Sequence, residues 1–288
     1  MKTQLTTTLK AQLGNSFEVL SATPLAGGDI NAVYKLSTTV GTLCVKINSA
    51  DKFPNLFETE ARGLQLLAEN SDFTIPEVIH QGNMGDKSYL LLSYLNEGIK
   101  TTDFWQSFGE KLAMLHQQSN LHFGLDHDNY IGSLHQSNKT AESWDSFYAN
   151  QRLIPQAKCA FDRGLVDLKF FEAIEALSLK LDSIFPDESP ALLHGDLWSG
   201  NYMTDDNGNP ALIDPAVYYG HREMDLAMTK LFGGFDTQMY QAYHATYPLE
   251  HKWEERIDLC QLYPILVHVN LFGGSYVSQA ARIISLYS

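Results

Sequence analysis

The stretch of sequence that decides the fold reads LHGDLWSGN at residues 193–201 and continues shortly afterwards as ALIDP at residues 211–215. It places Asp196 five positions before Asn201, and a second aspartate, Asp214, follows thirteen positions later. Phosphoryl transfer needs a base that receives a hydroxyl proton and oxygen ligands that hold magnesium against the phosphates. The spacing therefore predicts a proton acceptor, Asp196, next to two magnesium ligands, Asn201 and Asp214.

The residues between these side chains predict a hairpin. Residues 201–204 and 210–213 are short strand candidates, and the segment DDNGN at 205–209 has strong Asn-Gly turn chemistry. Such a hairpin brings Asn201 and Asp214 side by side at one end of two paired strands. Both side chains then reach one cation.

The same offsets occur in protein kinases as H-R-D-x-x-x-x-N and D-F-G, and here they are found from His194 to Asn201 and around Asp214. The alternative is structural, with Asp196 as a helix cap and Asp214 as a turn residue beside Pro215. For either aspartate alone the two interpretations are equal. Three residues at this spacing across a hairpin favour phosphoryl transfer from ATP with Mg²⁺.

Composition describes an ordinary soluble globular protein, with 288 residues, 44% hydrophobic and 19% charged residues. The formal charge of −14 opposes a nucleic-acid or anionic-membrane partner, because both require a basic surface. The N-terminus lacks the apolar run of a signal peptide, and no apolar stretch approaches the length of a membrane span. The three cysteines are far apart in the sequence and predict reduced thiols in a cytoplasmic protein.

The pattern of predicted elements changes along the chain. Residues 1–96 hold several strand candidates and one helix, from about Leu56 to Glu69, whereas residues 97–288 hold mainly amphipathic helices. The predicted fold class is α+β, with a small β-rich N-lobe, a short hinge and a larger helical C-lobe. This is the bilobal arrangement of protein kinases, and the N-lobe is expected to clamp ATP.

Lys46 is the predicted phosphate-binding cation of the N-lobe. Strand alternation puts Cys44 and Lys46 on one face of an otherwise apolar strand, so the lysine needs an anionic partner. Glu60 on the following helix is the predicted partner that orients Lys46, with Glu58 as the rival. Helical spacing alone does not decide between the two glutamates.

Two further segments of the N-lobe are expected to contact the nucleotide. Gly27, Gly28 and Asn31 lie between two strand candidates, where a glycine-rich hairpin covers the phosphates or simply forms a turn. Backbone groups near Leu92 to Leu95, with Ser93 and Leu95 as the named positions, are expected to bind adenine.

The segment after Asp214 contains the remaining candidates in the C-lobe. Asp225 is expected to brace the catalytic loop through backbone amides, and His194 within that loop is assigned structural support. His221 and Arg222 either face the substrate or cover the loop. His116, on an earlier helix, is interpreted as a hydrogen-bonded structural histidine.

These motifs resemble the fructosamine kinase (ketosamine-3-kinase) family, a branch of the aminoglycoside-phosphotransferase-like kinases, over nearly the whole chain. Residues 194–201 are similar to the family's H-G-D-L-W-x-G-N. Further similar stretches are D-P-A at 214–216, Y-G-H at 219–221, F-G-G-F at 232–235, D-N-Y-I-G at 128–132 with Gln136 and Asn138, and 148–156.

The resemblance implies an ATP-dependent kinase that phosphorylates the 3-hydroxyl of a ketosamine, the sugar adduct of a lysine or N-terminal amine. The phosphorylated adduct then breaks down and restores the amine. On this basis Asp196 is the base, Asn201 and Asp214 hold magnesium, and Lys46 with Glu60 positions the phosphates. Trp198 either packs the sugar or belongs to the core.

Two other functions remain open at this stage. A related kinase of an aminoglycoside, an amino alcohol such as choline, or another sugar shares every residue on the ATP side. A non-catalytic ATP-binding protein is the second alternative, although the base, metal ligands and lysine are all present. The preferred sugar, a free or protein-bound acceptor and the oligomeric state are not decided by the sequence.

Overall fold

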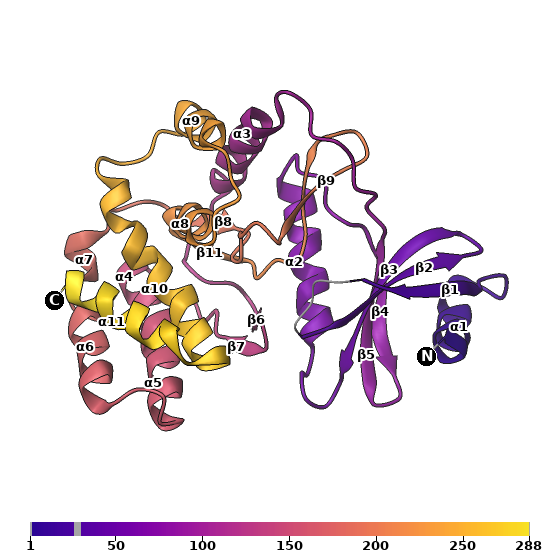
Figure 1. Ribbon diagram of the computed structural model, residues 1–288, viewed down its shortest axis with the longest axis horizontal. Helices are drawn as coiled ribbons and strands as arrows, with labels where there is room; N and C mark the ends of the chain where they lie inside the picture. Colours follow the sequence, from indigo (N-terminus) through magenta and orange to yellow (C-terminus); the bar gives the residue numbers. More distant parts are fainter. Residues whose placement is uncertain (1, 26–29, 288) are drawn as a thin grey trace.

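The computed structural model describes residues 2–25 and 30–287 and divides into two lobes (Figure 1). The N-lobe contains an antiparallel five-stranded sheet in the order β1-β2-β3-β5-β4, with one helix on each face. Its elements are α1 Lys2–Leu13, β1 Val19–Pro24, β2 Ala32–Thr38, β3 Gly41–Ser49, α2 Leu56–Asn70, β4 Val78–Met84 and β5 Lys87–Ser93.

Strand alternation divides the N-lobe core into two layers. Val45 in β3 and Leu91 in β5 face α1, whereas Leu90 in β5 and partly buried Cys44 face α2. The predicted faces of the Lys46 strand are therefore confirmed. Burial raises the pKa of the Cys44 thiol to about 11, so the side chain behaves as a small apolar group.

Helix α1 forms in a threonine-rich segment that predicts no helix. Leu5 and Leu9 are one turn apart and fully buried against the sheet. Since β-branched residues have low helix propensity, this docking is what stabilises the helix.

The C-lobe is mainly helical and contains three short two-stranded ladders. Its elements are α3 Phe104–His116, β6 Asn129–Ile131, β7 Leu134–Gln136, α4 Trp144–Phe147, a π-helix Tyr148–Leu153, α5 Ile154–Asp162, α6 Leu168–Ser178, α7 Leu181–Ile184, β8 Ala191–Leu193, β9 Tyr202–Thr204, β10 Pro210–Leu212, β11 Tyr218–Gly220, α8 Glu223–Leu231, α9 Thr237–Thr246, α10 Trp253–Phe272 and α11 Ser275–Leu286. In the described residues, none of these helices is long and apolar enough to cross a bilayer.

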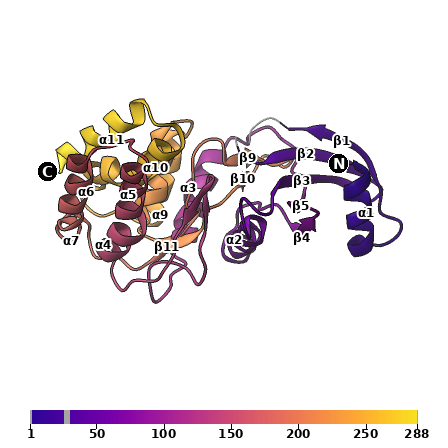
Figure 2. The same cartoon turned by 90° about the horizontal axis from the view of Figure 1, so that it is seen from below.

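The β9–β10 hairpin lies between the lobes (Figure 2). Thr74, in the loop after α2, bridges to Ala211 of β10, and its hydroxyl donates to Asp205 Oδ2 at 2.7 Å. On the other side, the Gly98 N–H in the interlobe linker donates to Thr204 O at 3.0 Å. The predicted hairpin is thus present, and it is hydrogen-bonded to the loop after α2 of the N-lobe and to the interlobe linker.

A buried ion pair joins loops of the C-lobe. The Arg222 guanidinium donates to both carboxylate oxygens of Glu188, at 2.8 and 2.7 Å, and also to the carbonyls of Tyr247 and Pro248. Burial alone would raise the pKa of Glu188, but the hydrogen bonds from Arg222 and the nearby positive charges lower it below its ordinary value.

Glu188→Gln should therefore destabilise the fold, because it leaves the Arg222 guanidinium buried without a counter-charge. We expect a loss of about 3 kcal/mol in the free energy of unfolding, measured by urea denaturation at pH 7. The matched control is Glu255→Gln, which removes an exposed ion pair with Lys252 and should cost less than about 1 kcal/mol.

The same pair predicts how this difference depends on pH. Since the folded-state pKa of Glu188 is depressed, its contribution is present above the ordinary value of 4.5 and is lost as the pH falls through the lowered value. The difference in the free energy of unfolding between wild type and Glu188→Gln should become smaller in acid. A difference that stays constant down to the acid transition would contradict this account.

Candidate active site

The catalytic loop begins where two short strands pair. β8 and β11 form a ladder, and next to it the Ala216 N–H donates to His194 O at 2.9 Å. Gly195 has a φ of +82°, and a Cβ at this position would lie 2.1 Å from Ala216 O. Only glycine fits such a close approach of two backbones. This contact holds the loop that carries Asp196 against the segment that follows Asp214.

Asp225, in the first turn of α8, supports the same loop. Its carboxylate accepts from the N–H groups of His194 at 2.7 Å and Gly195 at 3.0 Å. His116 Nε2 lies 3.3 Å from Asp225 Oδ2, and its Nδ1 lies 2.9 Å from Tyr243 Oη. Asp225 thus makes the backbone contacts expected from the sequence, and His116 is hydrogen-bonded within the core.

His194 links the two catalytic segments through its ring. Its Nε2–H donates to Ile213 O at 2.9 Å, immediately before Asp214. Burial lowers the pKa of His194, so the ring is neutral and keeps this single tautomer. The supporting role assigned to His194 agrees with this geometry.

Asp196 and Asn201 are in direct contact at the mouth of the cleft. Asn201 Nδ2 donates to the Asp196 carbonyl at 2.8 Å and to its Oδ2 at 3.0 Å. Burial raises the pKa of Asp196 to about 7 against the lowering effect of Asn201, and the carboxylates of Asp214 and Asp225 raise it further. A carboxylate whose pKa lies near neutrality is suited to accept a proton.

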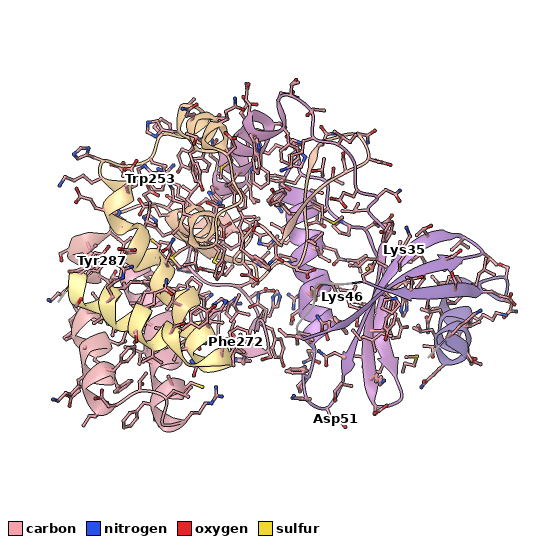
Figure 3. All side chains as sticks on the ribbon, in the orientation of Figure 1. Lys35, Lys46, Asp51, Trp253, Phe272 and Tyr287 are labelled. Carbon is pink, nitrogen blue, oxygen red and sulfur yellow. The ribbon has the colours of Figure 1, made fainter. Side chains whose placement is uncertain are left out.

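Lys46, which is labelled in Figure 3, pairs with two carboxylates from distant parts of the chain. Its Nζ donates to Glu60 Oε1 at 2.5 Å and to Asp214 Oδ1. Burial alone would lower the pKa of Lys46, but the two carboxylates raise it well above its ordinary value. Glu58 is exposed, so Glu60 is the partner that the sequence left undecided.

Asp214 has a φ of 55°, in the left-handed region that a side chain other than glycine rarely adopts. Aspartate tolerates this region better than most residues, and strained backbone is concentrated at functional sites. The Asp214 side chain is 39% exposed, whereas Lys46 beside it is buried. Lys46 therefore contacts the Asp214 carboxylate on one side, and the rest of the carboxylate is open to solvent.

The donors in the cleft fit magnesium that arrives with a nucleotide. Among the described residues no group of three or more His, Cys, Asp or Glu side chains could hold a metal by itself. Asp214 and the amide oxygen of Asn201 are the available ligands. Magnesium in nucleotide sites is bound by one or two protein groups together with phosphates and waters, and this set meets that description.

Two predicted substrate residues are corrected. Arg222 is 3% exposed and its guanidinium is occupied by Glu188 and two backbone carbonyls. His221 is 1% exposed and packs between the rings of Trp144 and Phe185. Both residues are thus buried in contacts within the C-lobe and do not face a substrate. The sequence did not reveal this because the partner Glu188 lies 34 residues earlier.

The predicted nucleotide contacts of the N-lobe have different outcomes. The Ser93 N–H donates to Glu77 O and its hydroxyl accepts from Glu77 N, so these two groups complete the sheet, and an adenine contact of the Ser93 backbone remains a prediction. Leu95 lies in the linker beyond β5 and remains a prediction. Asn31 accepts from Asn48 Nδ2 at 2.7 Å, and its contact with phosphate also remains a prediction. Gly27 and Gly28 lie outside the described residues.

A small cavity beside Asp196 has walls that the sequence did not identify. It is lined by Met224 and Met228 of α8, by Tyr263 and Pro264 of α10, and by residues of the catalytic loop. Trp198 stands outside it with 39% of its surface exposed, so it does not belong to the core. The only sequence signal for these walls was the helical spacing of Met224 and Met228.

Comparison with known proteins agrees with this geometry. The family model described as fructosamine kinase matches residues 1–287. A protein assigned as a ketoamine kinase in Lactiplantibacillus plantarum is 40% identical over 285 residues, covering 98% of this chain and 99% of that protein. The chloroplastic protein-ribulosamine 3-kinase of Arabidopsis thaliana is 35% identical, covering 95% of this chain and 84% of that protein.

Solved structures confirm the fold. A protein assigned as a fructosamine-3-kinase from Haemophilus somnus has a TM-score of 0.88 at 32% identity, covering 98% of this chain and 96% of that one. A thermostable mutant of aminoglycoside phosphotransferase APH(4)-Ia has a TM-score of 0.62 at 16% identity, with 98% of each chain covered. The predicted bilobal, kinase-like α+β fold is correct, and the chain belongs to the fructosamine kinase family.

Proposed function

We propose that this protein is an ATP-dependent kinase that phosphorylates the 3-hydroxyl of ketosamines, the adducts that sugars form with amines. The observation that carries the proposal is the convergence of Asp196, Asn201, Asp214 and Lys46, which come from both lobes, on one cleft. Phosphoryl transfer is catalysed mainly by positioning and charge stabilisation, and these four side chains supply both.

Asp196 is the base in this proposal. Its carboxylate accepts the proton of the sugar hydroxyl as that oxygen attacks the γ-phosphorus, and the hydrogen bond from Asn201 orients it. Lys46 turns from Asp214 toward the phosphate oxygens while Glu60 keeps its Nζ in place. Magnesium held by Asn201 and Asp214 would neutralise charge on the transferring phosphate.

The acceptor is assigned from the relatives together with the site. Relatives at 35–40% identity are named as a ketoamine kinase and a protein-ribulosamine 3-kinase. We infer that phosphorylation labilises the adduct and restores the amine, on a free amino acid or on a protein. We also infer a cytoplasmic location, which suits the three free thiols of Cys44, Cys159 and Cys260.

The direct test is phosphate transfer from radiolabelled MgATP to a fructosyl- or ribosyl-lysine acceptor. Aminoglycosides, choline and simple sugars form the comparison panel, because related kinases share the ATP side. Transfer to the lysine adduct at a higher kcat/KM than to the panel is the expected result. Preferred transfer to an aminoglycoside or choline would replace the proposed acceptor, and absence of any turnover would favour a non-catalytic ATP-binding protein.

Asp196→Asn should reduce kcat by roughly 10²–10⁴-fold, because the amide cannot accept the hydroxyl proton. Binding of MgATP, measured by calorimetry, should be nearly unchanged, since the substitution preserves the shape of the side chain. Retention of wild-type kcat on the lysine adduct would show that Asp196 is not the base.

The raised pKa of Asp196 predicts the acid limb of the rate profile. The value of kcat/KM for MgATP reports ionisations of the free enzyme, in which the pKa of Asp196 is about 7. Because the base must be ionised, kcat/KM should decrease as the pH falls below that value. A profile that is flat from pH 8 to pH 5 would contradict the assignment.

Asp214→Ala should abolish the magnesium dependence of ATP binding, because it removes the only carboxylate proposed as a metal ligand. Isothermal titration with and without Mg²⁺ measures this directly. Asp206→Ala, which removes an exposed carboxylate from the turn of the same hairpin, is the control and should keep the response to magnesium. Tight, magnesium-dependent binding by Asp214→Ala would refute the ligand role.

A further inference from the structure

Five aromatic rings form a continuous surface beside the catalytic loop, which we name the aromatic strip: Trp198, Phe232, His268, Phe272 and Tyr276. Ring centroids of neighbouring members are 4.9–6.2 Å apart, within the range of favourable aromatic contacts. Trp198, Phe232 and Phe272 are 39%, 45% and 57% exposed. A cluster of large apolar side chains that are exposed to solvent indicates a binding surface.

Two members of the strip lie one helical turn beyond residues that line the cavity beside Asp196. Met228 of α8 and Pro264 of α10 line that cavity, and Phe232 and His268 follow each of them by four residues, which is about one helical turn. Phe272 follows His268 by another turn, at the end of α10 that points toward the N-lobe (Figure 3). The strip therefore extends along the two helices, from the neighbourhood of Asp196 toward solvent.

The strip is held rigidly on the catalytic loop. Phe232 meets Trp198 edge to face with centroids 6.1 Å apart. Two residues later Gly234 has a φ of +91°, and a Cβ there would lie 2.6 Å from the Ser199 Cβ. The Gly234 carbonyl also accepts from Tyr202 Oη at 3.1 Å. The F-G-G-F segment, which the reaction itself does not use, thus aligns Phe232 with Trp198.

His268 adds a hydrogen-bond acceptor to the strip. Its Nδ1 lies 2.7 Å from Pro264 O, and a carbonyl can only accept, so Nδ1 carries the proton. In the neutral ring Nε2 is then an acceptor, and no partner for it is recorded in the described part of the chain. A ring face with an adjacent nitrogen acceptor is suited to bind an ammonium N–H.

A ketosamine has a cation at a fixed place relative to its reactive hydroxyl. The amine nitrogen is bonded to C1, two carbons from C3, and it is protonated near neutral pH. A substrate whose 3-hydroxyl contacts Asp196 therefore places an ammonium group a few ångströms away, beside the start of the strip. The chain's net charge of −14 also favours a cationic ligand.

We propose that the aromatic strip binds the amine half of the ketosamine, with Trp198, Phe232 and His268 around the ammonium group and Phe272 and Tyr276 along the attached alkyl chain. The inference rests on the proposed function and deepens it. Because the strip ends in solvent, it selects adducts of long alkyl amines such as a lysine side chain, including one within a peptide, over adducts of small amines.

The test compares three acceptors that share one sugar: a peptide with fructosyl-lysine, fructosyl-glycine, and the free sugar without an amine. The variants are Phe272→Ala, Phe232→Ala and His268→Leu, measured for kcat and for the KM of each acceptor and of MgATP. Leu286→Ala is the matched control, because Leu286 is also 57% exposed and lies at the far end of α11.

Phe272→Ala should raise the KM for the lysine adduct roughly three- to thirtyfold and leave fructosyl-glycine unchanged. Phe232→Ala and His268→Leu should raise the KM for both amine adducts by a similar factor. The free sugar, the KM of MgATP and the Leu286→Ala control should stay at wild-type values. Thermal melting should show that all variants remain folded.

The outcomes separate the two proposals. If the wild type phosphorylates the amine adducts and every variant has the wild-type KM, the role of the strip in binding the amine is refuted and the proposed function stands. An increase in KM that is the same for all three acceptors would show that the strip has a structural role, and would also refute its role in binding the amine. Absence of transfer to any amine adduct by the wild type would overturn both.

Discussion

The structure depends on one buried ammonium group. Lys46 is 5% exposed, and an unpaired charge in such a place is very costly, so the strand that carries it requires a carboxylate. It has two, and they lie 14 and 168 residues away, on α2 and directly after the β9–β10 hairpin. The pairing of one side chain therefore fixes α2 on the sheet and Asp214 against the N-lobe. The contact between Lys46 and Asp214 joins the two lobes, and the proposed function assigns the same lysine to the phosphates.

The catalytic loop is constrained on three sides by different kinds of contact. The backbone of Gly195 lies against Ala216, the carboxylate of Asp225 holds two of its amides, and Gly234 lies against Ser199. Rigid support of this kind is what positioning catalysis requires, because a small displacement of a base is costly in rate. The contact between Gly234 and Ser199 also keeps Phe232 beside Trp198.

Much of the site could be predicted because its signals are local. The hairpin, the alternation that turns Lys46 toward α2, and the spacing of Asp196 and Asn201 depend on neighbours within a few residues. The misassigned residues depended on distant ones. Arg222 is a basic residue of the kind that contacts substrates, but Glu188 and two backbone carbonyls bind its guanidinium. Helix α1 is stable because Leu5 and Leu9 pack against the sheet.

The amino-acid sequence by itself determined the class of fold and the hairpin, since both follow from short-range patterns. The same spacing predicts Asp196 as the base and Asn201 and Asp214 as oxygen ligands. Only the tertiary structure decided that Glu60 rather than Glu58 pairs with Lys46, because the choice depends on how α2 is rotated against the sheet. It also decided that Phe232, His268 and Phe272 share a surface with Trp198. Those rings come from three separate segments, and helix packing, which no local pattern encodes, brings them together.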